Sequence, residues 1–227
     1  MEGTLHISTH PVIAHKLSKL RSASTSSQNF RHLLHEITMY IGYETTASLP
    51  TQSVDIKTPI ATTKGFELSD RIALVPIMRA GLGMVDSMLD LLPNSAVHHI
   101  GMYRDKKSLL PIVYYNKLPA VCNADVAIVL EPMIASGATL HATITILKSW
   151  GCKKIIIMSV VGCKEGVEFL RGQHPDVSIY LAAVDSTLTK SGSISPGLGD
   201  IGDRYFDNLA HAETEGAGKR LMYSSWK

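Results

Sequence analysis

Short apolar runs alternate with helical segments through most of this chain, and this alternation constrains the fold more than any other feature. The runs are strand-sized, and the segments between them carry apolar residues three and four positions apart. Such runs are typical of parallel strands covered on both faces, because each crossover between parallel strands returns through a helix. We therefore expect an α/β fold, a mostly parallel twisted sheet with helices on both faces.

The elements of this fold can be placed along the chain by number. Strands are expected at 72–78, 96–103, 125–130, 154–161 and 177–185. Helices are expected at 10–45, 139–150 and 165–173, where the first range divides into two helices that Ser27 could separate as a cap. The alternating segment 111–117 predicts a projecting strand or arm, and the Thr- and Pro-rich stretch 46–70 carries short β-like pieces.

Composition excludes several classes of protein. The 227 residues contain 22 Lys and Arg against 20 Asp and Glu, a balance that does not favour binding to nucleic acid through bulk charge. A hydrophobic content of 45% excludes intrinsic disorder, and three cysteines without a CxxC pair exclude a disulfide scaffold. We expect a cytoplasmic protein with neither a nucleic-acid nor a membrane partner, since no secretory or membrane-spanning segment is evident.

The sharpest candidate binding loop follows the expected strand at 125–130. That strand delivers an acidic residue, Glu131, and small residues then allow close backbone approach before a helix begins near Thr139. Backbone N–H groups at a helix start, together with the helix dipole and two hydroxyl groups, suit a phosphate monoester. A tight turn at Ser136 and Gly137, with Thr139 as a helix cap, is the structural alternative. The loop matches neither a Walker A nor a GxGxxG motif.

Two further loops carry candidate ligand-binding groups after expected strands. In PIMRAGLGM, residues 76–84, the guanidinium of Arg79 can bind a phosphate. The segment SISPGLGDIGDR, residues 193–204, offers backbone groups and Asp200, a carboxylate that can meet a divalent cation through water. A surface arginine and an ordinary connecting loop are the structural alternatives. Arg104 could reach a diphosphate, although exposed Arg–Asp pairs are commonly just solvated.

The order of these segments resembles that of the uracil phosphoribosyltransferases, a family of type I phosphoribosyltransferases. The resemblance runs from about residue 10 to 206 and is carried by HPVIAHKLSKLR, PIMRAGLGMVDSMLDLLP, HIGMYRD, YYNKLP, EPMIASGAT and PGLGDIGDRYF. It implies a type I phosphoribosyltransferase fold with a projecting β-arm and a small hood at about 186–206. It also implies a single domain over 1–207, with N-terminal helices at 10–45 and a core at 70–185.

Members of this family transfer the phosphoribosyl group of 5-phosphoribosyl 1-diphosphate (PRPP) to uracil, which gives UMP and diphosphate, with Mg²⁺ as cofactor. The resemblance assigns catalysis to Asp200, Arg104 and Arg79, and it places Asp200 beside the metal through water. These three residues would also bind PRPP, together with Glu131, Pro132, Met133, Ile134, Ala135, Ser136, Gly137, Ala138 and Thr139. The uracil edge would be bound by Ile194, Gly199, Asp200 and Ile201.

Three features depart from the family pattern. Glu131 stands where the family usually has aspartate, and ASGAT at 135–139 replaces ATGGS, which keeps the acceptor and the hydroxyl groups. Ser193 replaces an aromatic residue ahead of the uracil loop, which would remove a stacking or lid contact. The tail at 208–227 extends beyond the usual end of the family and has no assigned role.

An active uracil phosphoribosyltransferase of pyrimidine salvage is the first functional hypothesis. Ser193 keeps open the alternative of a catalytically weakened sensor or regulator that binds PRPP or UMP, and a third hypothesis is transfer to another base. The family also implies a homodimer or higher homo-oligomer in which the YYNKLP arm reaches a neighbour. An allosteric nucleotide such as GTP is a further expectation.

Overall fold

A nine-stranded sheet forms the centre of the protein. The structure, a computed structural model, describes residues 2–105, 110–189 and 192–208. The strands are β1 (Leu5–Ile7), β4 (Ile72–Met78), β5 (Ala96–Val97), β6 (Ile100–Arg104), β7 (Pro111–Asn116), β8 (Val126–Leu130), β9 (Met133–Ile134), β10 (Lys154–Cys163) and β11 (Ser178–Asp185). The main path runs β1-β11-β10-β8-β4-β6-β7, with β5 beside β4 and β9 beside β10. Only the β6–β7 pair is antiparallel, so the expected mostly parallel sheet is confirmed.

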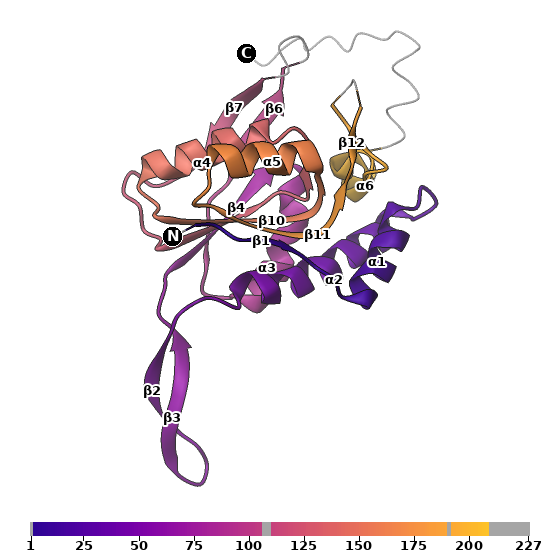
Figure 1. Ribbon diagram of the computed structural model, residues 1–227. Coiled ribbons are helices and arrows are strands. Elements are labelled where there is room, and N and C mark those ends of the chain that lie inside the picture. Colours follow the sequence, from indigo (N-terminus) through magenta and orange to yellow (C-terminus); the bar gives the residue numbers. More distant parts are fainter. Residues whose placement is uncertain (1, 106–109, 190–191, 209–227) are drawn as a thin grey trace, which may run out of the picture.

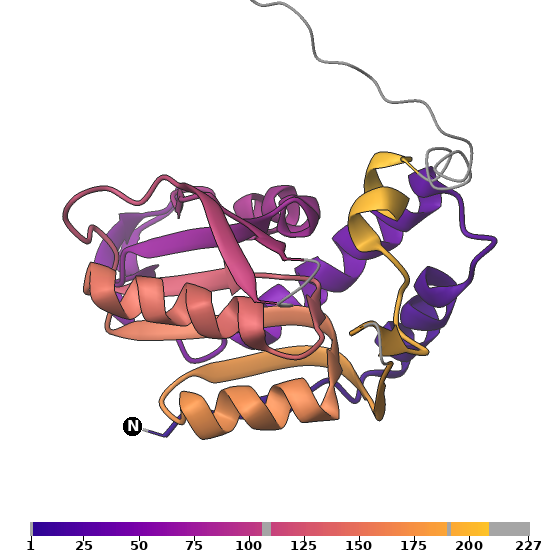
Figure 2. The same ribbon diagram turned by 90° about the horizontal axis from the view of Figure 1, so that it is seen from above.

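Helices cover both faces of this sheet (Figures 1 and 2). One face packs against α1 (Pro11–Arg21), α2 (Ser27–Thr46) and α3 (Val85–Leu91), and the other against α4 (Ala138–Trp150) and α5 (Lys164–Gln173). In β4, Ile72 and Leu74 enter the first apolar core, while Ala73 and Val75 enter the second. This alternation explains why the strand is continuously apolar in sequence, because both of its faces are buried.

Local signals explain where the helices begin and end. The hydroxyl group of Ser26 accepts a hydrogen bond from the Asn29 backbone N–H at 3.3 Å, so Ser26 caps α2, and the expected cap at Ser27 is wrong by one position. The Ser27 hydroxyl instead donates to Asp207 at 2.7 Å. Gly151 ends α4 in the left-handed conformation, as its position in the sequence indicates.

The projecting arm of the structure differs from the one expected from sequence. A hairpin of β2 (Thr51–Lys57) and β3 (Thr62–Leu68) extends away from the body (Figure 1) and pairs with no other strand among the described residues. The expected strand at 111–117 is present as β7, but it pairs with β6 at the edge of the central sheet. The residues of β2 and β3 are largely exposed, so the 46–70 stretch lacks the alternation of apolar and polar residues that would have predicted a hairpin.

The segment that follows β11 forms the hood, residues 186–206. It contains two short antiparallel strands, β12 (Thr187–Leu188) and β13 (Ile194–Ser195), and a helix, α6 (Ile201–Phe206). Residues 193–204 are expected from sequence to form a loop, and α6 shows that the end of this segment is helical instead. The helix forms because the Asp200 carboxylate accepts from the Asp203 backbone N–H at 2.9 Å and so caps its start.

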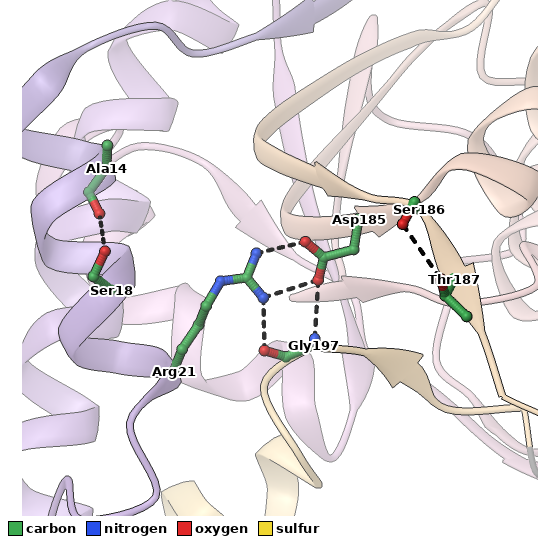
Figure 3. Close-up of polar contacts among 7 residues, drawn as sticks. All are labelled: Ala14, Ser18, Arg21, Asp185, Ser186, Thr187 and Gly197. Carbon is green, nitrogen blue, oxygen red and sulfur yellow. Dashed lines mark hydrogen bonds and ion pairs between the residues drawn. The ribbon is translucent and has the colours of Figure 1, made fainter.

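A charged network fastens the hood to the body (Figure 3). The Arg21 guanidinium, at the end of α1, donates to both carboxylate oxygens of Asp185 at 2.7 and 2.8 Å. It also donates to the Gly197 carbonyl oxygen at 2.7 Å, while the Gly197 N–H donates to Asp185 at 2.9 Å. Asp185 is buried at the end of β11, so one bidentate ion pair fixes the middle of the hood.

Arg204 makes a second attachment from within α6. Its guanidinium donates to the Leu198 carbonyl at 2.7 Å and to the Ser22 carbonyl at 2.6 Å. It also lies 4.4 Å from the centre of the Phe30 ring on α2, a favourable cation–π distance. Burial lowers the pKa of Arg204, yet its hydrogen bonds satisfy the charge. The hood is thus joined to both N-terminal helices.

In the part of the chain that the structure describes, no helix is both long and apolar enough to cross a membrane.

Replacing Arg21 with alanine tests the network. Arg21→Ala leaves the buried Asp185 carboxylate without its cation, so we expect a loss of about 2–4 kcal/mol in the free energy of unfolding. Urea denaturation measures this loss. The matched control is Arg71→Ala, which breaks the solvent-exposed pair with Asp125 and should cost under about 1 kcal/mol. Equal losses in the two variants would contradict the role assigned to Arg21.

Candidate functional site

Two of the candidate loops leave the same edge of the sheet from neighbouring strands. Pro76 on β4 lies beside Leu130 at the end of β8, so Arg79 and Glu131 emerge close together. Gly81 lies in a short 3₁₀ helix, η1 (Ala80–Met84), that packs against the end of β8. A Cβ atom at this position would lie 2.2 Å from the Leu130 carbonyl oxygen, so only glycine permits this approach.

The loop after β8 is held by backbone contacts on two sides. Pro132 accepts hydrogen bonds at its carbonyl oxygen from the N–H groups of Val160 and Val161 at 3.0 and 3.1 Å, which bends the loop onto β10. Below the loop lies Gly166 on α5, where a Cβ atom would approach the Ala135 carbonyl oxygen to 2.0 Å. The loop therefore rests directly on the α5 backbone, without an intervening side chain.

The helix that follows the loop begins at a glycine. Gly137 has φ of 82°, precedes the first residue of α4 and makes no side-chain cap. The alternative of Thr139 as the cap is therefore wrong, because Thr139 already lies inside the first turn. The first N–H groups of a helix have no partners within it, so this turn presents donors and the positive end of the helix dipole to the loop.

A pocket of about 400 Å³ lies where this loop faces the hood. Its lining from the loop and α4 consists of Glu131, Met133, Ile134, Ala135, Ser136, Gly137, Thr139 and Leu140. Its lining from the hood consists of Gly192, Ser193, Ile194, Gly199 and Asp200. Two segments that lie more than fifty positions apart in the sequence thus form opposite walls of one concave site.

Of the expected residues whose side chains the structure describes, four do not line the pocket: Arg79, Pro132, Ala138 and Ile201. Pro132 points its carbonyl group into the β10 contact, and Ala138 begins α4 without reaching the pocket. The side chain of Ile201 is buried in the apolar core, so only its backbone could face a ligand. Arg104 ends β6, where its backbone pairs with Pro111, and its side chain lies outside what the structure describes.

Arg79 lies beside the hood rather than in the pocket wall. Its guanidinium is 3.2 Å from the Asp203 carboxylate in the first turn of α6, and its side chain is about half exposed. A Cβ atom on the intervening Gly202 would lie 3.3 Å from both Arg79 Nη2 and Asp200 Oδ1. The guanidinium and the two carboxylates therefore meet at one end of the pocket, where a charged ligand can exchange with an exposed ion pair.

Glu131 has an unusual electrostatic environment. Surrounding protein desolvates its carboxyl group and raises its pKa to about 8, although part of the residue still reaches the pocket surface. The Met133 backbone N–H donates to this carboxylate, which lowers the pKa and partly offsets the effect of desolvation. A group that changes charge near neutral pH is suited to a site that binds donors such as sugar hydroxyls.

The pocket carboxylates fit Mg²⁺ only as part of its coordination, with water and substrate phosphates supplying the other ligands. Among residues 2–105, 110–189 and 192–208 there is no group of three or more side chains placed to hold a metal ion. Magnesium is commonly bound through one or two carboxylates, with water and substrate phosphates completing its coordination. Asp200, a hard oxygen donor at the pocket, satisfies that pattern.

Several residues that shape the site were absent from the sequence-based assignment. Leu140 and Gly192 line the pocket, Asp203 pairs with Arg79, and Gly166 supports the loop. Gly166 carried a usable signal, because glycine inside a helical segment lowers stability and commonly has a packing reason. Ser193 had been noticed only as a departure from a pattern, and it lies in the pocket wall.

A parallel sheet that presents an acidic residue and a helix-start loop to a separate hood is the arrangement of type I phosphoribosyltransferases, and this chain has that fold. A solved structure of an Aquifex aeolicus protein superposes with a TM-score of 0.85 at 30% identity, covering 89% of this chain and 98% of that one. The family model described as uracil phosphoribosyltransferase matches residues 7–208. The chain belongs to the uracil phosphoribosyltransferase family.

Curated relatives agree with this assignment. The uracil phosphoribosyltransferase of Roseiflexus sp. (strain RS-1) is 48% identical over 200 residues, covering 88% of this chain and 96% of that protein. The enzyme of the same name from Dictyoglomus thermophilum is 48% identical over 198 residues, with 87% and 96% covered. The family assigned from sequence is thereby confirmed.

The Glu131 environment predicts a pH dependence that Glu131→Gln should remove. Between the unfolded pKa near 4.5 and the folded value of about 8, only the folded state holds the proton. The stability of the wild-type protein should therefore fall relative to Glu131→Gln as pH rises through that range, by up to about 5 kcal/mol in total, and level off above it. Urea denaturation from pH 5 to 9 measures both proteins, and parallel stability curves would refute the assigned environment.

Proposed function

We propose that this chain transfers the phosphoribosyl group of PRPP to N1 of uracil, forming UMP and diphosphate. The observation that carries the proposal is the single pocket in which the loop after β8 faces the hood. A nucleotide needs one wall for a sugar phosphate and another for a base, and these two segments supply walls of different chemistry. The catalytic domain corresponds to residues 1–207.

The loop wall suits the ribose 5-phosphate part of PRPP. Glu131 is placed to accept hydrogen bonds from ribose hydroxyls, and residues 135–139 surround the 5′-phosphate with backbone N–H and hydroxyl groups. Binding would favour the ionised form of Glu131, because a carboxylate accepts stronger hydrogen bonds from sugar hydroxyls than a neutral carboxyl group does. The close contact between Gly166 and the Ala135 carbonyl oxygen supports the loop in this position.

The hood wall suits a planar base with a carbonyl–NH–carbonyl edge. The segment around Gly199 has a positive φ and turns backbone groups toward the pocket, beside Ile194. Backbone N–H and carbonyl groups of Gly199 and Ile201 would match the uracil edge, with the Ile201 side chain remaining in the core. Ser193 lies in the same wall, at the position where the family usually has an aromatic residue, and the pocket is present with serine there.

Charge stabilisation at the departing diphosphate is the main catalytic task. Breaking the bond at the anomeric carbon develops positive charge on the ribose ring and negative charge on the leaving group. Arg79 would release Asp203 and bind the diphosphate, and Arg104 would approach from β6. Magnesium, when bound, neutralises phosphate charge, and Asp200 would hold it through water. Asp200 is also the candidate to accept the uracil proton.

Among the described residues, no feature favours the alternative of a catalytically weakened sensor or regulator that binds PRPP or UMP. The predicted homo-oligomer, allosteric GTP and cytoplasmic location stay predictions.

Purified protein supplied with uracil, PRPP and Mg²⁺ should form UMP. Uracil should be used in preference to hypoxanthine, adenine and orotate, because the hood backbone matches the uracil edge. Chromatographic detection of each nucleotide measures the preference. Binding of PRPP or UMP by a folded protein that makes no UMP would instead identify the sensor, and preferred use of another base would overturn the substrate assignment.

Arg79→Ala and Asp200→Asn should each lower turnover by about 10²- to 10³-fold. Neither should change the free energy of unfolding by more than about 1 kcal/mol, since the Arg79 ion pair is exposed and asparagine caps helices as aspartate does. Lys64→Ala, on the β2–β3 hairpin, is the control for loss of a surface charge and should keep full turnover. Losses of stability that match the losses of rate would argue for structural roles.

A further inference from the structure

Two cysteines lie close together at the edge of the sheet opposite the pocket. Cys122 is in the connection between β7 and β8, and Cys152 follows α4 just before β10 begins. Both stand at the amino-terminal ends of their strands, whereas the pocket lies at the carboxyl ends. Both are free thiols. The proposed transferase activity uses neither residue.

Three observations bring the two thiols together. A Cβ atom placed on Gly151, the neighbour of Cys152, would lie 3.7 Å from Cys122 Cβ. Cys152 belongs to the apolar core beneath α4, and Cys122 packs against that same core. The Trp150 indole N–H donates to the Pro119 carbonyl at 2.7 Å, which holds the connection against the end of α4. The two thiol groups interact electrostatically. Each donates its own hydrogen bond to a nearby carbonyl, Cys122 to Ala124 at 3.3 Å and Cys152 to Lys154 at 3.4 Å.

The two thiols differ in their access to solvent. Cys122 is partly exposed and lies near the Arg71 guanidinium, which also pairs with Asp125. Cys152 is 4% exposed, and burial, with a smaller contribution from Cys122, raises its pKa to about 11. An oxidant arriving from solvent therefore meets Cys122 first, and Cys152 is placed to react second.

We propose that Cys122 and Cys152 form a dithiol site that a peroxide converts to an intramolecular disulfide. The Cys122 thiolate attacks one peroxide oxygen and breaks the O–O bond, which gives a sulfenic acid and one water once the leaving hydroxide is protonated. The Cys152 sulfur then attacks the Cys122 sulfur. The S–O bond breaks, an S–S bond forms, and the Cys152 proton leaves with the hydroxide as a second water. Two thiols are oxidised, and one peroxide is reduced.

This cross-link would join the connection before β8 to the start of β10. It closes a loop that contains β8, the pocket loop and the whole of α4, and it restricts the unfolded chain accordingly. The pocket lies at the opposite ends of these strands, so the oxidised protein should keep its catalytic geometry.

Peroxide treatment of the full-length, reduced protein tests the site. We expect non-reducing peptide mapping to find one cross-linked pair of peptides containing Cys122 and Cys152, with the loss of two hydrogen atoms in the intact mass. The melting temperature should rise by several degrees, and a thiol reductant should reverse both changes. A Cys163→Ala variant keeps both thiols of the pair and should give the same cross-link.

Single substitutions separate the two roles. Cys152→Ser should leave a Cys122 sulfenic acid that dimedone traps, whereas Cys122→Ser should show neither cross-link nor trapped adduct. Over-oxidation of Cys122 to sulfinic acid in the wild-type protein, without a cross-link to Cys152, would overturn the proposal. Dimers linked only through Cys122, or resistance of Cys122 to peroxide, would overturn it as well.

Discussion

The geometry of the site depends on the ion pair between the buried carboxylate of Asp185 and the Arg21 guanidinium. Asp185 stands at the end of β11, where the sheet stops and the hood begins, and it binds Arg21 from α1 and the Gly197 backbone together. The position of Gly197 in turn fixes the backbone that leads to Gly199 and Asp200. A charge this well buried is tolerated because the ion pair is bidentate and the remaining acceptor capacity is used by a backbone N–H. Together with the attachment made by Arg204, the Asp185 side chain positions the hood opposite the other wall of the pocket.

The opposite wall is positioned by a different physical principle, direct contact between backbones. Gly81 brings η1 against the end of β8, and Gly166 brings α5 against the loop that starts α4. These contacts leave no space for a methyl group, so they set the loop position through van der Waals repulsion rather than through charge. The hood is held instead by ion pairs and hydrogen bonds together with apolar side chains such as Leu198, so the two walls are positioned by different kinds of contact.

The sequence predicted the parts of the molecule that rest on local pattern. The strands β4, β8 and β10 were evident because both of their faces are buried, and α4 because Gly151 marks its end. The β2–β3 hairpin was not recognised as an arm because its residues are largely exposed. The helix α6 was not predicted because the glycines before it are typical of a loop. Contacts such as Arg79 with Asp203 could not be derived, since they depend on how distant segments meet in space. The family resemblance supplied the candidate residues, and the fold brought most of them to one pocket.

The separate attachment of the hood has a consequence for how such proteins diverge. Because the wall formed by the loop after β8 is built into the sheet edge and α5, substitutions there disturb the core of the fold. The hood, residues 186–206, joins the body through the polar contacts of Arg21 and Arg204 and through buried side chains such as Leu198. Its pocket-facing positions, such as Ser193, lie outside these attachments, so they can change with little effect on the sheet. Selection for a different nucleobase can therefore act on a small, replaceable part of the chain while the transfer chemistry is inherited unchanged.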